Sequence, residues 1–205
     1  MNPYTDLPSR NFWKTGIRDA SPYQIDDLHQ KKFDISPGSL LASAGSCFAQ
    51  YFPKYIKNTS IDYCDLEKAP SHFSEHDAQS YGYDLYSARY GNIYSLRQLN
   101  QLLKESQGDF YPAFPVWENE NRFFDSLRPT IEPQGFVSID ELTNMRRFHL
   151  EKVSKLFQAI DVFIFTLGMT EIWHDPASTT VYPTAPGVIA GQNYINKIKF
   201  HNLTF

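Results

Sequence analysis

Two short hydrophobic segments, each followed by glycine and polar residues, most constrain what this chain can fold into. Residues 39–44 are small or apolar and are followed by Gly45-Ser46-Cys47. Residues 162–167 are mainly β-branched or aromatic and are followed by Gly168-Met169-Thr170-Glu171. Apolar runs without polar alternation are typical of strands buried on both faces of a parallel sheet. We therefore expect both segments to be strands, with 162–167 in the centre of the sheet.

The segments between these strands show helical periodicity. Apolar residues in 48–58 recur at helical spacing, although Pro53 predicts a local distortion there. Amphipathic helices are expected at about 95–105 and at 139–160, the second with a capping box of Ser138 and Glu141. A short strand at 60–64, a hairpin at 118–124 and a mostly irregular stretch at 65–91 complete the pattern. Alternating strands and helices predict an α/β fold with a mostly parallel sheet, whose sites lie beyond the carboxyl ends of its strands.

The bulk composition narrows the class of protein. A chain of 205 residues can form one domain with a sizeable core, and we interpret residues 1–37 as a lead-in segment that packs on a domain formed by 38–205. The net charge of -4 argues against a general nucleic-acid binder. Neither a signal peptide nor a run of about 18 apolar residues is present, so we expect no membrane span and a cytoplasmic location. The two cysteines form no disulfide framework.

Ser46 has two interpretations from its local sequence. It lies where a buried strand should turn into a helix, so its hydroxyl could cap that helix. Alternatively, the free backbone N–H groups there could stabilise an oxyanion while Ser46 acts as a nucleophile, with the small Ala44 and Gly45 leaving room for a substrate. The neighbouring Cys47 is either a small filler or a thiol whose pKa is lowered at the helix terminus.

Other polar residues also allow two interpretations. His72 and His76 have a metal-ligand spacing, but no third ligand accompanies them, so we predict a solvated loop and no metal site. We expect His149 to face solvent or a crevice. Arg89 and Arg128 are either contacts for a substrate carboxylate or phosphate, or structural ion pairs. Seven aromatic residues belong either to the core or to a sugar- or acyl-binding cleft, namely Tyr81, Tyr83, Tyr86, Tyr90, Trp117, Trp173 and Tyr182.

The string Gly45-Ser46-Cys47-Phe48-Ala49 resembles the signature of the GSCFA family. Four further blocks follow in the family's order, at residues 90–94, 124–129, 165–173 and 182–188. The resemblance extends over residues 39 to 205. Because the family is grouped with the SGNH hydrolase superfamily, it implies a three-layer, flavodoxin-like α/β fold and a serine nucleophile in the first block.

The resemblance also implies roles for individual residues. Ser46 would be the nucleophile and its own N–H an oxyanion-hole donor, joined by the N–H of Gly91. Residues 168–171 occupy the place of the superfamily's Gly-x-Asn-Asp motif, so that Gly168 begins the block and Thr170 replaces the asparagine. A hydroxyl can donate one hydrogen bond, and Asn92 is an alternative source of the amide. Glu171 would hold the Ser46 turn or bond a backbone N–H.

The superfamily's general base is a histidine near the carboxyl terminus, three residues after an aspartate. This sequence has no such pair near Phe205, so we expect the sheet to be incomplete at its carboxyl end. Of the histidines present, His174 is the best substitute, although it could equally be an exposed loop residue. A serine without a positioned base is a poor nucleophile.

Two classes of function follow from these residues. The first is a serine esterase or acyltransferase that needs no cofactor and acts on a small-molecule or saccharide ester, such as an O-acylated saccharide. The second is a non-catalytic binding or scaffold domain, or an inactive fragment. A thiol enzyme based on Cys47 is a weaker third. The sequence predicts no oligomeric state.

Overall fold

The computed structural model describes residues 2–23, 25, 28–56 and 58–203. The contacts within the chain divide it into two units, residues 1–35 and 36–205. The first contains a 3-10 turn, η1 (Ser9–Asn11), and a short π-helix, η2 (Lys14–Arg18). None of the described residues of this unit is buried, so the core described below belongs to residues 36–205.

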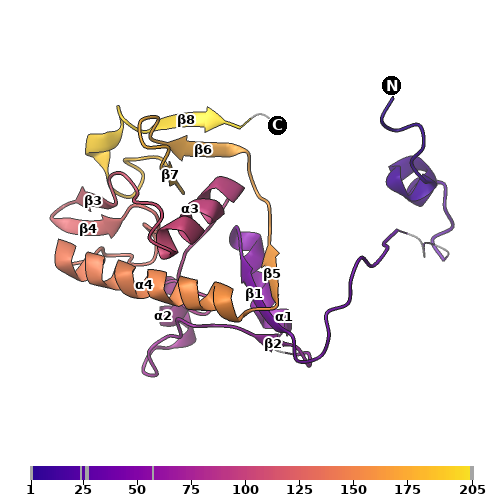
Figure 1. Ribbon diagram of the computed structural model, residues 1–205, viewed down its shortest axis with the longest axis horizontal. Coiled ribbons are helices and arrows are strands. Elements are labelled where there is room, and N and C mark those ends of the chain that lie inside the picture. The colour runs from indigo at the N-terminus through magenta and orange to yellow at the C-terminus, as the bar shows by residue number, and fades with distance from the viewer. Residues whose placement is uncertain (1, 24, 26–27, 57, 204–205) are drawn as a thin grey trace. The chain divides into compact units, whose positions relative to one another are not determined.

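A small parallel sheet lies in the second unit (Figure 1). Its order is β2-β1-β5, where β1 is Leu40–Ala44, β2 is Asp62–Tyr63 and β5 is Val162–Phe165. Residues 41–44 of β1 are buried, whereas all of β5 is half-buried. The prediction that 162–167 forms a central strand is therefore wrong. Among the described strands β5 pairs only with β1, which leaves β5 at the edge and β1 in the centre.

The segment after β1 changes helix type along its length. Residues Cys47–Tyr51 form a 3-10 helix, η3, and Phe52–Ile56 form α1. Pro53 follows the junction directly, and without an N–H it cannot donate to the carbonyl of Ala49, which accepts from the N–H of Phe52 instead. The predicted distortion around Pro53 is confirmed as this change from a 3-10 helix to an α-helix.

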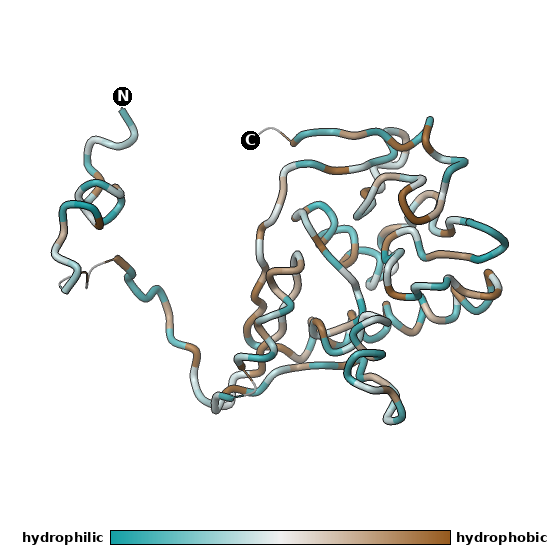
Figure 2. Tube along the Cα trace, turned by 180° about the vertical axis from the view of Figure 1, so that it is seen from behind, coloured by the Kyte–Doolittle hydropathy of each residue, from teal (hydrophilic) through white to brown (hydrophobic). Residues whose placement is uncertain are grey.

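Two longer helices pack against the sheet. The N-cap residue of α3 (Leu96–Ser106) is Ser95, which forms a capping box with Gln98. Ser138 caps α4 (Ile139–Ala159) by accepting a hydrogen bond from the N–H of Glu141 at 3.1 Å. Hydrophobic and polar residues alternate along α4, as expected for a helix with one buried face (Figure 2). The core that the two helices share with the parallel sheet consists of Ala42, Ala44, Ala49, Cys64, Tyr86, Ala88, Tyr90, Ile93, Leu99, Val153 and Leu156.

Residues 65–91 are mostly irregular, as expected. They contain a short helix, α2 (Glu75–Ser80), whose N-cap residue Ser74 accepts a hydrogen bond from the N–H of Asp77 at 3.1 Å. Beyond Cys64, the chain continues alongside the end of β1. Ser87 donates its N–H to Ser43, and Ile93 donates its N–H to Gly45 at 2.8 Å. This segment therefore borders the part of β1 that leads to Ser46.

The rest of the unit contains antiparallel strands. One hairpin pairs β3 (Val116–Asn119) with β4 (Arg122–Asp125), close to the predicted position. A second sheet has the order β7-β6-β8, formed by Val181–Tyr182, Glu171–His174 and Lys199–Asn202, with the 3-10 turn η4 (Gln192–Tyr194) before β8. The expected mostly parallel sheet is thus only partly present, and the fold is a mixed α/β architecture.

The direction of β7 has a local cause. After β6, the N–H of Asp175 donates to the carbonyl of Thr180 at 2.9 Å, so that the chain reverses within six residues. A connection this short can join only antiparallel strands, because a parallel return needs a crossover of a dozen residues or more. Within the described residues, no helix is long and apolar enough to cross a membrane.

Candidate functional site

Ser46 follows the central strand β1 and is the N-cap residue of η3. Its side chain makes no capping hydrogen bond, so the interpretation of its hydroxyl as a helix cap is wrong. Its carbonyl oxygen accepts hydrogen bonds from the N–H of Ala49 at 2.9 Å and from the phenol of Tyr86 at 3.0 Å. The backbone of Ser46 is thus held on its carbonyl side, while its half-buried hydroxyl has no described partner.

Two glycines allow the ends of β1 and β5 to approach each other. Gly45 has a φ of +149°, and a Cβ there would lie 2.0 Å from Oγ1 of Thr166. A Cβ on Gly168 would lie 3.9 Å from Oγ of Ser46 and 3.6 Å from the carbonyl oxygen of Tyr94. Gly168 therefore lies beside the Ser46 hydroxyl without placing a side chain in front of it.

Asn92 belongs to a hydrogen-bonded cluster that reaches the Ser46 turn. Its Oδ1 accepts a hydrogen bond from the phenol of Tyr86 at 2.6 Å, so the one phenol proton is shared between Asn92 and the Ser46 carbonyl. Gln50 donates to that phenol at 3.1 Å and to Asn92 Oδ1 at 3.3 Å. The amide nitrogen of Asn92 donates to the hydroxyl of Tyr94 at 2.9 Å. Burial raises the pKa of Tyr86, so its phenol stays protonated as a donor.

Gly91 and Thr170 have other neighbours. Gly91 is buried with a φ of +65°, and a Cβ there would lie 3.8 Å from Oγ1 of Thr130. The hydroxyl of Thr170 donates to Oδ1 of Asn202 at 2.9 Å, which ties the start of β6 to the end of β8. Within the described part of the chain, neither residue makes a hydrogen bond to the Ser46 side chain.

The remaining predicted site residues, as far as the structure describes them, also make no hydrogen bond to the Ser46 hydroxyl. Glu171 is exposed at the start of β6, and Cys47 is exposed at the start of η3. His174 is half-buried beside His201, with ring centroids 5.5 Å apart. Burial, followed by the neighbouring His201 and Arg97, lowers the pKa of His174, which is therefore neutral at pH 7. No described histidine or carboxylate hydrogen-bonds to Ser46, and no group of three or more His, Cys, Asp or Glu among the described residues is placed to hold a metal ion.

A pocket of about 160 Å³ lies next to this cluster. Three of the five sequence blocks contribute to its wall, at residues 90–94, 124–129 and 182–188. Tyr94 links the pocket to the fourth block, because its carbonyl accepts a hydrogen bond from the N–H of Met169 at 3.2 Å. The lining residues are Asn92, Tyr94, Leu127, Arg128, Pro129, Thr130, Pro183, Thr184 and Ile189.

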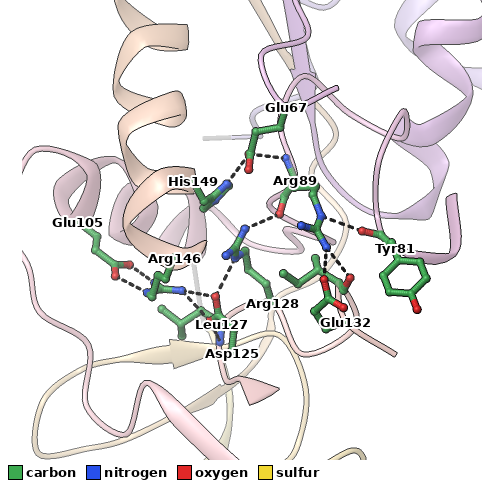
Figure 3. A network of polar contacts seen from close by, with 11 residues as sticks. Glu67, Tyr81, Arg89, Glu105, Asp125, Leu127, Arg128, Glu132, Arg146 and His149 are labelled. Atoms are coloured by element: carbon green, nitrogen blue, oxygen red, sulfur yellow. Dashed lines mark hydrogen bonds and ion pairs between the residues drawn. The ribbon is translucent and has the colours of Figure 1, made fainter. Parts of the chain in front are cut away.

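A buried network of ion pairs, which no sequence pattern predicted, includes the pocket residue Arg128 (Figure 3). Arg146 of α4 donates to Glu105 of α3 at 2.8 Å and to Asp125 of β4 at 2.6 Å. Arg128 donates to the same Asp125 at 2.8 Å and to the carbonyl of Arg89 at 2.9 Å. Burial would raise the pKa of Asp125, but the two guanidinium groups outweigh it and hold that pKa well below its usual range.

His149 joins this network through Glu67. The two side chains lie 2.6 Å apart, and Glu67 also accepts the N–H of Arg89 at 2.8 Å. His149 is fully buried, so the expectation that it faces solvent or a crevice is wrong. Burial, and next the charge of Arg128, lowers the pKa of His149 to about 4, so a neutral ring donates its Nδ1–H to Glu67 at pH 7.

The two arginines proposed as substrate contacts are engaged in structural pairs. Arg89 donates to the carbonyls of Tyr81 and Ile131, each at 2.8 Å, and to Glu132 at 2.9 Å. Both Arg89 and Arg128 are almost entirely buried. The partners in the network are up to 82 residues apart in the chain, so no local pattern could have revealed them.

Comparison with known proteins identifies a family for this chain but no individual relative. No curated protein and no solved structure matches the chain. The model of the GSCFA family matches residues 40–205, from the first residue of β1 onward, and so includes Ser46 and the four later blocks. This match covers most of the sequence, and the chain therefore belongs to the GSCFA family.

Proposed function

We propose that this chain is a serine esterase or acyltransferase domain of the SGNH type, in which Ser46 attacks the carbonyl carbon of an ester. One observation carries the proposal: Ser46 stands at the carboxyl end of the central parallel strand with its hydroxyl unbonded within the described residues. Gly168 leaves the space beside that hydroxyl open. The carboxyl edge of a parallel sheet is where α/β proteins carry their sites.

The proposed reaction divides into two transfers. In the first, Oγ of Ser46 forms a bond to the acyl carbon, the ester C–O bond breaks, and the alcohol leaves with the serine proton. In the second, water or another alcohol takes the acyl group from Ser46 and returns a proton to it. Each of these proton transfers needs a general base. His174 is the candidate for this role because its side chain is neutral at pH 7.

The negative charge on the attacked carbonyl oxygen needs donors nearby. We assign this role to the backbone N–H of Ser46 and to the amide of Asn92, whose side chain belongs to the cluster at the Ser46 turn. Nδ2 of Asn92 carries two N–H groups, of which one is used by Tyr94. Thr170, another predicted donor, would have to turn its hydroxyl from Asn202. Preorganised donors of this kind lower the activation barrier by about 3 kcal/mol each.

A fluorophosphonate probe tests the proposal directly, because it reacts covalently with activated serine hydroxyls. We expect the folded chain to be labelled, Ser46→Ala to be unlabelled and Cys47→Ala to be labelled as the wild type is. The neighbouring cysteine is the matched control, since it also distinguishes a thiol nucleophile. Labelling that persists in Ser46→Ala, or the absence of labelling in a folded wild-type chain, would reject the proposal.

A second function is favoured by a separate observation. Among the described residues, no base hydrogen-bonds to Ser46, and the hydroxyl of Thr170 is used by Asn202. A domain with this arrangement would bind an ester or saccharide without turning it over. It would give saturable binding with neither probe labelling nor ester hydrolysis.

A further inference from the structure

The pocket beside Asn92 has accessible polar groups on its wall that make no hydrogen bond to the described residues. The hydroxyls of Thr130 and Thr184 have no hydrogen-bond partner within the described residues. Arg128 uses its Nε and Nη1 on Asp125 and Arg89, while its Nη2 donates to no described atom. The Arg128 side chain is only 4% exposed, yet its Nη2 is not one of the fully buried atoms without a partner, so this donor is accessible from the pocket. The wall therefore offers hydrogen bonds that the protein itself does not use.

The rest of the wall is apolar. Leu127 and Ile189 contribute aliphatic side chains, and Pro129 and Pro183 contribute ring faces. No carboxylate lines the pocket. The charge of Arg128 is matched by Asp125 at 2.8 Å, so the pocket has no excess charge to attract an anion. A pocket wall that combines polar and apolar groups and has no net charge suits a neutral, hydroxyl-bearing ring.

The volume sets the size of the ligand. At about 160 Å³, the pocket is smaller than the roughly 300 Å³ at which drug-sized ligand sites begin. One ring of monosaccharide size would fill it, and a second ring would have to remain outside.

Two residues of the pocket wall also lie near the Ser46 turn. Its wall residue Tyr94 places a carbonyl oxygen 3.6 Å from the point where a Gly168 Cβ would stand, and Oγ of Ser46 lies 3.9 Å from the same point. Asn92 belongs both to the wall and to the cluster that holds the Ser46 turn. A ring in the pocket could therefore present a substituent toward Ser46.

We propose that this pocket binds the alcohol half of the ester substrate, as a single neutral sugar ring that presents its acylated hydroxyl to Ser46. The link to an ester rests on the function proposed above, whereas binding of the ring requires no chemistry. The two can therefore be tested separately.

The test uses Ser46→Ala in the full chain, so that no turnover occurs. Methyl β-glucopyranoside is titrated against ¹⁵N-labelled protein, and amide shifts are followed at Thr130, Thr184 and Ile189. We expect saturable shifts at these amides. In the double variant that adds Thr184→Trp, whose indole would fill the pocket, binding should weaken by at least about tenfold. Adding Thr143→Trp instead, on the exposed face of α4, should leave the affinity unchanged.

Two further probes decide between ligand classes. Hexanoate tests an acyl chain, and glucuronate tests a charged ring of the same size. Equal or stronger shifts of the same amides by hexanoate, tighter binding of glucuronate, or no saturable shift with the glucoside would each overturn the proposal. If the glucoside binds but the wild type is not labelled by fluorophosphonate, the pocket assignment stands and the esterase proposal fails.

Discussion

The phenol of Tyr86 donates a hydrogen bond to the carbonyl oxygen of Ser46 at 3.0 Å, across 40 residues of sequence. The same phenol oxygen contacts Asn92 and Gln50. Because the Ser46 carbonyl also accepts from Ala49, the turn that carries the hydroxyl is fixed from two sides. Tyr86 is thus a positioning residue for Ser46 in the proposed mechanism.

Replacement of Tyr86 by phenylalanine should slow fluorophosphonate labelling of Ser46 by about tenfold, because a loosened turn places the hydroxyl less accurately. The free energy of unfolding should fall by about 1–3 kcal/mol, because the Ser46 carbonyl, Asn92 and Gln50 each lose a contact to a buried hydroxyl. Tyr63→Phe is the matched control, since its hydroxyl lies 2.7 Å from Oγ of Ser43 and not at the turn. Equal labelling rates in the two variants would contradict the positioning role.

The two glycines beside Ser46 should respond differently to alanine. In Gly45→Ala the methyl group would collide with Thr166 at a strained φ, so we expect a loss of about 3 kcal/mol in the free energy of unfolding. In Gly168→Ala the nearest atoms are 3.6 Å away, and stability should stay within about 0.5 kcal/mol of the wild type. Labelling of Ser46 should nevertheless slow in Gly168→Ala, because the methyl narrows the approach to its hydroxyl. Urea unfolding and probe kinetics measure the two effects, and a stable Gly45→Ala would refute the packing argument.

Arg146→Met should be strongly destabilising. The substitution leaves the buried carboxylates of Glu105 and Asp125 without their shared partner, and loss of one partner from a buried ion pair costs about 3–5 kcal/mol. Arg147→Met is the control, because Arg147 is the next residue on α4 and is exposed. Urea unfolding of the two variants should differ by most of that amount. Similar midpoints would show that the network contributes little.

The pair of His149 and Glu67 predicts how stability depends on pH. The pKa of His149 is lowered from 6.5 to about 4, so its contribution is complete above pH 6.5 and is lost as the pH falls toward 4. This loss is on the order of 3 kcal/mol. The pKa of Glu67 is lowered from 4.5 to about 2, so its contribution is present above pH 4.5 and is lost as the pH falls through 2.

A variant separates the histidine from the carboxylate. In His149→Asn, the amide can still donate to Glu67 but does not titrate, so the decline in stability between pH 6.5 and 4 should become shallower. His72→Asn, a change at an exposed histidine, should retain the wild-type slope. Unfolding free energies measured at several pH values give these slopes. Identical slopes for the two variants would contradict the assignment of the pH dependence to His149.

Local patterns in the sequence located most of the elements near the candidate site. The run that became β1, the cap at Ser138 and the hairpin at 118–124 each depend on neighbouring residues, so a local pattern specifies them. The approach of Gly168 to Ser46 is consistent with the expectation that sites lie beyond the carboxyl ends of parallel strands. These features required no knowledge of distant contacts.

Features that depend on distant residues could not be predicted in this way. His149 was misplaced because its partner Glu67 is 82 residues earlier in the chain. Tyr86 looked like any other aromatic residue, since its role depends on Asn92 and on the Ser46 carbonyl.

The packing of Gly45 against Thr166 has a consequence for how the family's signature is used in annotation. The glycine is required by the close approach of two strands, whereas the serine beside it contributes to no packing or cap described here. A homologue that keeps the glycine and loses the serine should therefore retain the architecture without the proposed chemistry. Scoring the two positions separately would distinguish family members that keep both the fold and the proposed nucleophile from those that keep the fold alone.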